Sequence, residues 1–261
     1  MIKIDKYLNF RQTIISAILL LIIPFGLLAQ SSRVENMPTY DYAKYHFGFV
    51  LAVNQMHFSI KPTEGLYYKT FDAVQAKEIN ADSAMIYSVE DEPSMGFTVG
   101  IVSNLRLGEY FDLRFIPSLS FGERNLNYRF LKYRDGNSEI VEIQKNVPST
   151  YIETPLHLKY KSKRLNNLRA YLLTGPNLRI DLASEAKKRQ DAAEVQVKLK
   201  QLDAAWDLGV GFDFYFEWFK LGTELKMSYG FFDVLKHENN IYTLGIDQLR
   251  SKIFQVSFTF E

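Results

Sequence analysis

Residues 206–229 read WDLGVGFDFYFEWFKLGTELKMSY, two runs in which apolar residues alternate with polar or small ones, joined by a tight turn near Glu217. In a β-strand successive side chains point to opposite faces, so each run predicts a strand with one apolar and one charged face. Together the runs predict an antiparallel hairpin. A soluble β-sandwich and a membrane barrel both show this period, so the rest of the chain must distinguish them.

The same alternation marks eight segments, at 44–59, 94–107, 110–133, 149–161, 167–181, 204–216, 218–230 and 250–260. Long connections lie at 60–93, 134–148, 182–203 and 231–249, and they alternate with short ones at 108–109, 162–166 and 217. A transmembrane barrel produces this order because one side carries turns and the other carries loops. The sequence therefore predicts an all-β fold, an eight-stranded antiparallel transmembrane β-barrel of the outer-membrane type with long extracellular loops and periplasmic turns.

The first 29 residues have the layout of a secretory signal peptide, with three basic residues before an apolar run from Ile14 to Leu28 and a small residue at Ala29. The alternative is an uncleaved anchor, which is disfavoured because the run is shorter than the ~20 residues of a spanning helix. We expect residues 1–29 to be the signal peptide, 30–43 a periplasmic segment and 44–261 the barrel. The expected location is the cell outer membrane.

Composition agrees with an exported barrel. The chain has no cysteine, so an exported protein of this size has no disulfide to stabilise it. Its formal charge of +1 argues against a nucleic-acid-binding surface. Aromatic residues make up 15% of the chain, and barrels place such residues in belts at the two membrane interfaces.

The alternation assigns one face of each strand to lipid and the other to the barrel interior. No charged residue interrupts the lipid face, whereas the charges on the interior face are nearly balanced in sign. Eight strands enclose a space that side chains fill, and buried charges persist only when paired. We expect a salt-bridged plug, with a proton or small-ion path as the alternative. The candidate network contains Arg106, Asp112, Arg114, Glu153, Lys159, Arg179, Asp181, Asp207, Asp213, Lys220, Glu224 and Lys226.

Two local features predict irregular strands. Near Glu123–Asn125 the apolar residues of the third segment change parity, which predicts a β-bulge. Pro117, Pro155 and Pro176 lie inside predicted strands, where proline removes a ladder hydrogen bond. Each of these prolines predicts a bulge or a local break.

With a sealed interior, function is expected in the loops. Residues 182–204 are rich in charge and contain neither Gly nor Pro, which permits a short helix, either a solvated one or one that docks a partner. The first loop has apolar surface that can pack on itself or on another protein. Its candidate partner-contact residues are Tyr67, Tyr68, Phe71, Met85, Ile86 and Tyr87.

The residues of catalysis are not arranged in a recognisable pattern. His46, His57, His157 and His237 are the only histidines, and none has the spacing of a Ser/His/Asp triad or of a metal site. The chain also has no Gly-rich phosphate loop. We therefore expect no enzymatic activity, no cofactor and no metal.

Three blocks of the chain resemble the PorT family of the Bacteroidota. They are residues 38–41 leading into 46–49, residues 111–117 followed by 121–124, and residues 151–156 with 159–164. The resemblance implies an outer-membrane component of the type IX secretion system, needed for export of proteins with C-terminal sorting domains and, in some members, for gliding motility.

The family is often described as a protein-translocating porin, but a plugged eight-stranded barrel leaves no room for a polypeptide. The expectation is an accessory subunit that assembles, stabilises or gates the translocon. Its expected partners are the large translocon barrel or periplasmic components of that system, together with outer-membrane lipid. The alternative is a stand-alone structural or adhesive barrel that binds ligands through its loops.

Overall fold

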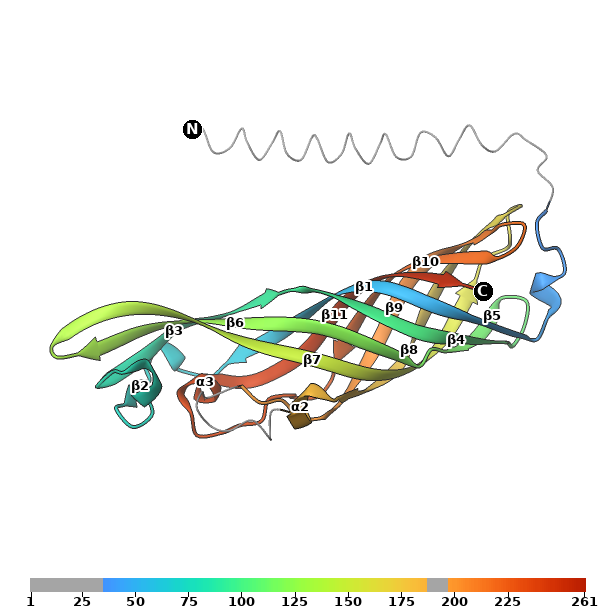
Figure 1. Cartoon of the computed structure of the whole chain (residues 1–261). Coiled ribbons are helices and arrows are strands. Elements are labelled where there is room, and N and C mark those ends of the chain that lie inside the picture. The colour runs from blue at the N-terminus through green and yellow to red at the C-terminus, as the bar shows by residue number, and fades with distance from the viewer. Residues whose placement is uncertain (1–34, 187–196) are drawn as a thin grey trace, which may run out of the picture. The chain divides into compact units, whose positions relative to one another are not determined.

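The computed structural model describes residues 35–186 and 197–261, and the predicted signal peptide lies outside them. Within these ranges the chain forms one antiparallel sheet of eleven strands (Figure 1). The strands are β1 Tyr45–Pro62, β2 Thr70–Asp72, β3 Ser83–Pro93, β4 Met95–Arg106, β5 Phe111–Phe115, β6 Ser118–Arg134, β7 Asn137–Lys161, β8 Leu168–Asp181, β9 Leu202–Tyr215, β10 Lys220–Gly230 and β11 Ile246–Phe260. The helical pieces are short, namely η1 Tyr40–Tyr42, η2 Leu66–Tyr68, η3 Lys77–Ile79, α2 Ala183–Ala186 and α3 Ile241–Leu244.

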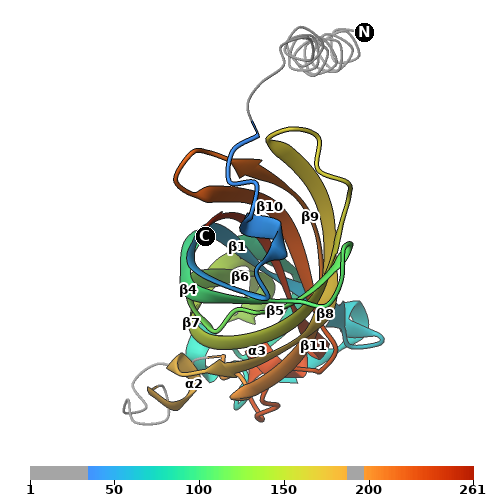
Figure 2. The same cartoon turned by 90° about the vertical axis from the view of Figure 1, so that its right-hand side faces the viewer.

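The sheet closes on itself as a barrel because β1 pairs with β11 on one edge and with β4 on the other (Figure 2). The ring runs through β1, β11, β10, β9, β8 and β7, then through β5 and β6, and returns through β4. Both β5 and β6 pair with β4 and with β7, and neither register changes across Ile116–Pro117. The ring therefore has eight positions when β5 and β6 are counted together.

The prediction of eight strands differs from the eleven observed for two physical reasons. Pro117 has no N–H to donate, so the predicted strand 110–133 is divided into β5 and β6. The predicted first loop contains β2 and β3, and β3 adds to the free edge of β6. The breaks predicted at Pro155 and Pro176 also occur, because the β7–β8 pairing is interrupted between Pro155↔Asn177 and Leu158↔Thr174.

The predicted long loop 134–148 is wrong. β6 and β7 form a continuous hairpin from Ser118↔Glu153 to Arg134↔Asn137, closed by Asp135 and Gly136. Both turn residues have positive φ, 49° and 77°, which is the geometry of a type I′ turn. Asp-Gly is the residue pair that favours this turn, so the hairpin does have a sequence signal.

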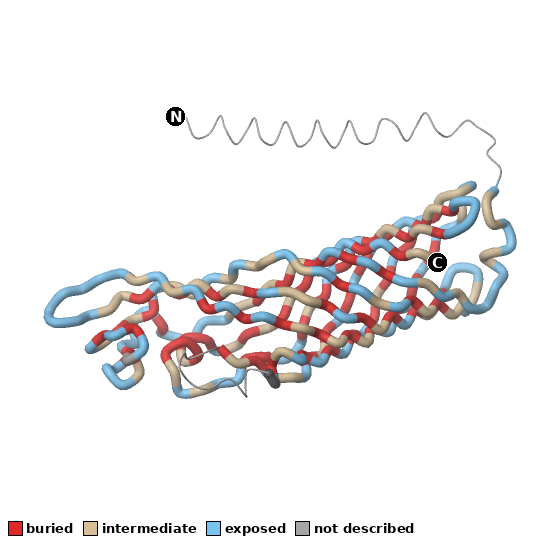
Figure 3. Tube along the Cα trace, viewed as in Figure 1, coloured by how far each residue is buried: buried red, intermediate tan, exposed pale blue. Residues whose placement is uncertain are grey.

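The bulge predicted near Glu123–Asn125 is also absent, because the β6–β7 register is unbroken there. From Ser118 to Phe130 the even-numbered residues of β6 are buried, apart from the half-buried Gly122. Buried and more exposed positions alternate in this way along the strands of the barrel (Figure 3). The apolar residues change face instead: Phe121 lies on the outer face, whereas Leu126 and Tyr128 lie on the inner face. The parity change in the sequence therefore reflects a change in what surrounds the two faces of β6. The backbone pairing itself does not change.

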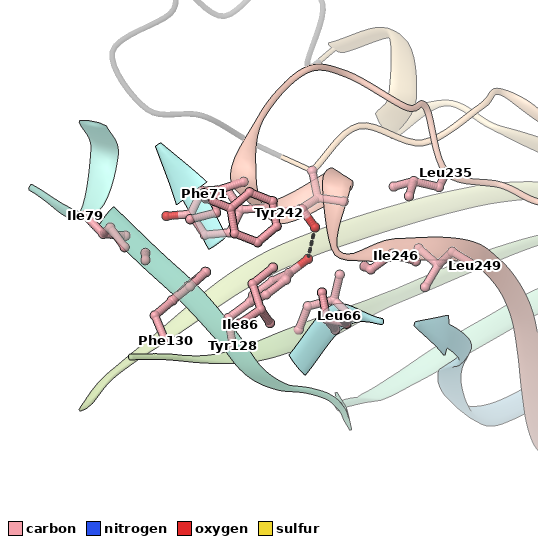
Figure 4. Close-up of a cluster of buried hydrophobic side chains, with 14 of the residues drawn as sticks. Leu66, Phe71, Ile79, Ile86, Tyr128, Phe130, Leu235, Tyr242, Ile246 and Leu249 are labelled. Carbon is pink, nitrogen blue, oxygen red and sulfur yellow. Dashed lines mark hydrogen bonds between the residues drawn. The ribbon is translucent and has the colours of Figure 1, made fainter. Parts of the chain in front are cut away.

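Beyond Asn125 of β6, the strands enclose a second core, and this core is apolar (Figure 4). Four parts of the chain build it: the end of β1 with the first loop and β3, the β6–β7 hairpin, residues 197–199, and residues 234–249. We call this assembly the platform. The platform lies at the end opposite the short turns, and we name the two ends the loop end and the turn end.

Candidate functional site

The outer wall of the barrel is apolar, as predicted. Leu51, Val99, Leu158, Val210 and Phe258 are all exposed, and each lies on the face assigned to lipid. Aromatic pairs stack across neighbouring strands of this wall, as in Phe49–Phe260 and Phe97–Phe121. Such an exposed apolar surface is unstable in water, so it indicates contact with lipid.

The interior near the turn end is filled by a charge cluster centred on Glu261. Its carboxylate accepts hydrogen bonds from Arg114 Nη2 at 2.9 Å and from Lys220 Nζ at 2.8 Å. Lys159 Nζ lies 2.7 Å from Asp213 Oδ2, and Arg114 Nη1 lies 3.5 Å from Glu224 Oε2. Every one of these side chains is buried, so opposite charges compensate one another where water is scarce.

A second interior cluster surrounds Asp207, closer to the loop end. Its carboxylate lies 2.9 Å from His157 Nε2, 3.5 Å from Lys226 Nζ and 3.8 Å from Arg179 Nη2. The other Arg179 nitrogen, Nη1, lies 3.5 Å from Asp203 Oδ2. One carboxylate thus faces three basic side chains.

The structure buries eleven of the twelve predicted interior charges. Asp112 pairs with Lys161 at 2.6 Å, Glu153 accepts from Asn177 Nδ2 at 2.9 Å, and Asp181 accepts from the backbone N–H of Ala183 at 3.0 Å. The exception is Arg106, which is half-buried beside the short β4–β5 turn and donates to the Gly108 carbonyl at 3.2 Å. Glu261, Lys161 and Asp203 are also partners of these charges, and the predicted network did not include them.

The segment before β1 closes the turn end of the barrel. Asp41 accepts from Arg169 Nη1 and Nη2 at 2.9 and 2.8 Å and from Tyr215 Oη at 3.0 Å, while Tyr40 Oη donates to Glu261 at 3.1 Å. Burial raises the pKa of Asp41, but Arg169 outweighs it, so this pKa lies below its usual range. The cavity left beneath the segment is about 10 Å³, room for about one water molecule.

The six predicted contact residues differ in how far the platform exposes their side chains. Phe71 and Ile86 are fully buried in its core and Met85 is half-buried, so Phe71 and Ile86 cannot touch a partner. Tyr67, Tyr68 and Tyr87 are 60%, 90% and 61% exposed. The predicted contact surface is therefore reduced to these three tyrosines, and the apolar residues between them support the loop from below.

Hydrogen bonds hold the loops of the platform together. Tyr128 Oη donates to the Tyr242 carbonyl at 3.2 Å (Figure 4), and burial raises the pKa of Tyr128. Asp233 accepts from the backbone N–H groups of Leu235 and Leu249 at 3.2 and 2.9 Å. Burial raises the pKa of Asp233, but these donors outweigh it and the pKa falls below its usual range. The platform is thus a folded unit with its own core.

One edge of the platform sheet has no partner strand among the described residues. β7 pairs with β6 from Asn137 onward, but its pairing with β8 begins only at Tyr151. Residues 137–149 of β7 therefore offer backbone N–H and C=O groups along an edge that another strand can pair with. The short helix expected within 182–204 is limited to α2 where the chain is described, and residues 187–196 lie outside the described ranges.

The four histidines have structural partners. His46 Nε2 lies 2.8 Å from the Tyr40 carbonyl, His57 Nδ1 lies 3.0 Å from Asp91, and His237 Nε2 lies 3.0 Å from Asp233. Within residues 35–186 and 197–261, no group of three or more His, Asp or Glu side chains is arranged to hold a metal ion. The same ranges contain no helix that is long and apolar enough to cross a membrane.

Comparison with known families explains the closed sheet and its apolar wall. Residues 28–236 match the outer membrane protein beta-barrel domain family. The chain belongs to this family. Its location is therefore the outer membrane.

Three solved structures of outer-membrane proteins align with this chain at low sequence identity and low TM-score. Neisserial surface protein A aligns at 12% identity and a TM-score of 0.37, over 81% of this chain and 95% of that one. OprG from Pseudomonas aeruginosa aligns at 12% identity and a TM-score of 0.37, over 84% of this chain and 94% of that one. The outer membrane protein AlkL, solved in lipid bilayers, aligns at 12% identity and a TM-score of 0.34, over 88% of this chain and 97% of that one. No curated protein matches the sequence.

Proposed function

We propose that this outer-membrane barrel is a non-enzymatic anchor that presents its platform to partner proteins. The observation that carries the proposal is the platform itself, a folded core with three exposed tyrosines and an unpaired β7 edge. Ring positions β1 and β4–β11 would cross the membrane as an eight-position barrel. Its interior charges are paired, which disfavours conduction of ions or polypeptide.

More specifically, we propose an accessory subunit of the type IX secretion system that assembles, stabilises or gates the translocon. Residues 1–29 would direct export, and the short turns and both termini of the barrel would face the periplasm. Support for this finer assignment comes from the resemblance to the PorT family of three blocks, namely residues 38–41 with 46–49, 111–117 with 121–124, and 151–156 with 159–164. Export of cargo with C-terminal sorting domains, and gliding where present, would depend on the subunit. The expected partners are the large translocon barrel, which could contact the platform, or periplasmic components, which could contact only the turn end.

The test compares platform variants with a matched control. One strain carries Tyr67→Ala, Tyr68→Ala and Tyr87→Ala together, and the control carries Tyr42→Ala and Tyr45→Ala, which remove exposed tyrosines at the turn end. Each protein is purified from outer membranes in mild detergent, bound proteins are identified by mass spectrometry, and secreted cargo is measured. We expect the platform variant, and not the control, to lose its partners and to reduce cargo secretion.

A stand-alone adhesive barrel remains the second candidate because the platform faces away from the periplasm in this orientation. In that case crosslinked outer membranes would yield only the monomer, and secretion would be normal in both strains. A loss of partners in the control alone would move the contact to the turn end. Either result contradicts docking through the platform.

A further inference from the structure

The lipid-facing wall contains a groove of about 400 Å³ that crosses five strands, β4, β1, β11, β10 and β9. Its volume lies within the ~300–1,000 Å³ range of ligand pockets. Two rows of cross-strand neighbours line it. One row is Met95, Gln55, Phe254, Met227 and Leu208, and the other contains Val53, Val256, Leu225 and Val210.

Eight of the nine side chains in these two rows are apolar, and Gln55 is the exception. Toward the turn end the next row contains Phe258 and Phe212, and toward the loop end it contains Tyr229 and Trp206. The groove is thus lined mainly by Val, Leu and Met side chains together with the Phe254 ring, and further aromatic rings lie beyond both rows. Such a groove favours an extended apolar chain over a polar ligand.

Two cations stand where the groove reaches the loop end. Lys252 lies on the same face of β11 as Phe254, about 7 Å closer to the loop end. Its Nζ lies 4.9 Å from the centre of the Phe254 ring. Arg250 comes next on this face of β11.

These two cations differ from their basic neighbours. Lys61 Nζ lies 2.7 Å from Asp247, and His57 Nδ1 lies 3.0 Å from Asp91. Among the described residues, no carboxylate lies within ion-pair distance of Lys252 or Arg250. Two uncompensated positive charges therefore adjoin the apolar groove at the level where the wall stops being apolar.

We propose that this surface binds one phosphorylated glycolipid of the lipid A type from the outer leaflet. An acyl chain lies in the groove, and a phosphate contacts Lys252 and Arg250. Charge complementarity selects an anionic headgroup, and a guanidinium can bind a phosphate through two parallel hydrogen bonds. The cations lie at the loop end, which faces outward in a barrel with its turns in the periplasm, so the lipid comes from the outer leaflet. This inference requires the membrane orientation but no role in secretion.

Native mass spectrometry of the full chain tests the site. The protein is placed in nanodiscs that contain lipid A, dephosphorylated lipid A and phosphatidylglycerol, and the retained lipid is identified. We expect one lipid A to be retained in preference to both competitors. The double variant Arg250→Gln with Lys252→Gln should lower retention about tenfold or more, because each cation near the surface favours an anionic headgroup.

A second variant tests the groove without changing charge. Leu225→Trp fills the space and should also lower lipid A retention. The control for the charge variant is Arg129→Gln with Lys132→Gln, which removes two platform cations that pair with Glu142 and Glu139. The control for Leu225→Trp is Leu158→Trp, on the wall of β7. The controls should retain lipid A as the unaltered protein does. Electrophoretic mobility before and after heating verifies that each variant folds.

Three results would overturn the proposal. The first is equal retention of lipid A by the folded double variant and the unaltered protein. The second is equal retention of phosphatidylglycerol, which would remove the preference for the outer leaflet. The third is a lipid-free dimer that Leu225→Trp dissociates, since a second copy of the chain would then cover the groove.

Discussion

The two ends of strand β6 place opposite kinds of residue on the same face. Toward the turn end, Leu119 points outward and Ser120 points inward, whereas toward the loop end Arg129 points outward and Phe130 points inward. β1 changes in the same way, from an outward Val53 to an outward Lys61. The backbone register continues through both regions. What changes is the surroundings, from lipid outside a polar interior to water outside an apolar core, and this inversion locates the membrane boundary.

The comparison also explains how each region is stabilised. In the barrel, paired charges fill the interior and hydrogen-bonded strands form the wall, so stability depends on complete pairing. In the platform, burial of apolar side chains is the main favourable contribution. Changes in one region should therefore act through a mechanism that is absent from the other, and variants can test this separation.

The largest effect should come from Asp207→Ala in the barrel interior. The change leaves His157, Arg179 and Lys226 without their shared carboxylate. Removing one partner of a buried ion pair destabilises by about 3–5 kcal/mol. Urea unfolding of the protein in lipid vesicles measures the loss. Glu142→Ala, which removes an exposed ion pair with Arg129, should change stability by less than ~1 kcal/mol.

Phe71→Ala should destabilise the platform by about 3–5 kcal/mol, since a fully buried phenylalanine is lost from its core. The expected effect is local: hydrogen exchange should speed up in β3, α3 and the distal part of β6, while the strands of the barrel wall stay protected. The control is Tyr68→Ala, which removes an exposed ring from the same loop. Equal loss of protection in both regions would show that they unfold together.

Several of these features could be predicted from sequence because they depend on local pattern. Alternation identified the ring strands and their apolar face, as for Leu51 and Val210, while the signal peptide and the order of long and short connections assigned that face to lipid. β3 was missed because its period is broken by a register shift between Ile86 and Ser88. The ion-pair partners could not be predicted, since Arg114 and Glu261 are 147 residues apart and meet only when the barrel closes.

Leu158→Arg tests the lipid side of the boundary directly. Leu158 is exposed on the outer wall of β7, and a basic residue there should cost about 2–4 kcal/mol if the position lies near the bilayer midplane. Gln144→Arg places the same charge on the outer face of β7 within the platform, where water surrounds it, and should change stability little. Unfolding in vesicles compares the two. Equal penalties would mean that the inversion of faces does not mark the boundary.

The smallest effect should be a pH-dependent release of the segment that closes the turn end. The pKa of Asp41 is lowered in the folded state, mainly because Arg169 outweighs the effect of burial. Stability from this contact is therefore fully present above the unfolded pKa of about 3.9 and is lost as pH falls through the lower, folded pKa. The chain has no native cysteine, so a spin label on Thr39→Cys reports this segment alone. Its mobility should increase only below about pH 4, while Asp41→Asn should give high mobility already at pH 7. An immobile label in Asp41→Asn at neutral pH would show that the other contacts of the segment, such as Tyr40 with Glu261, are sufficient to hold it.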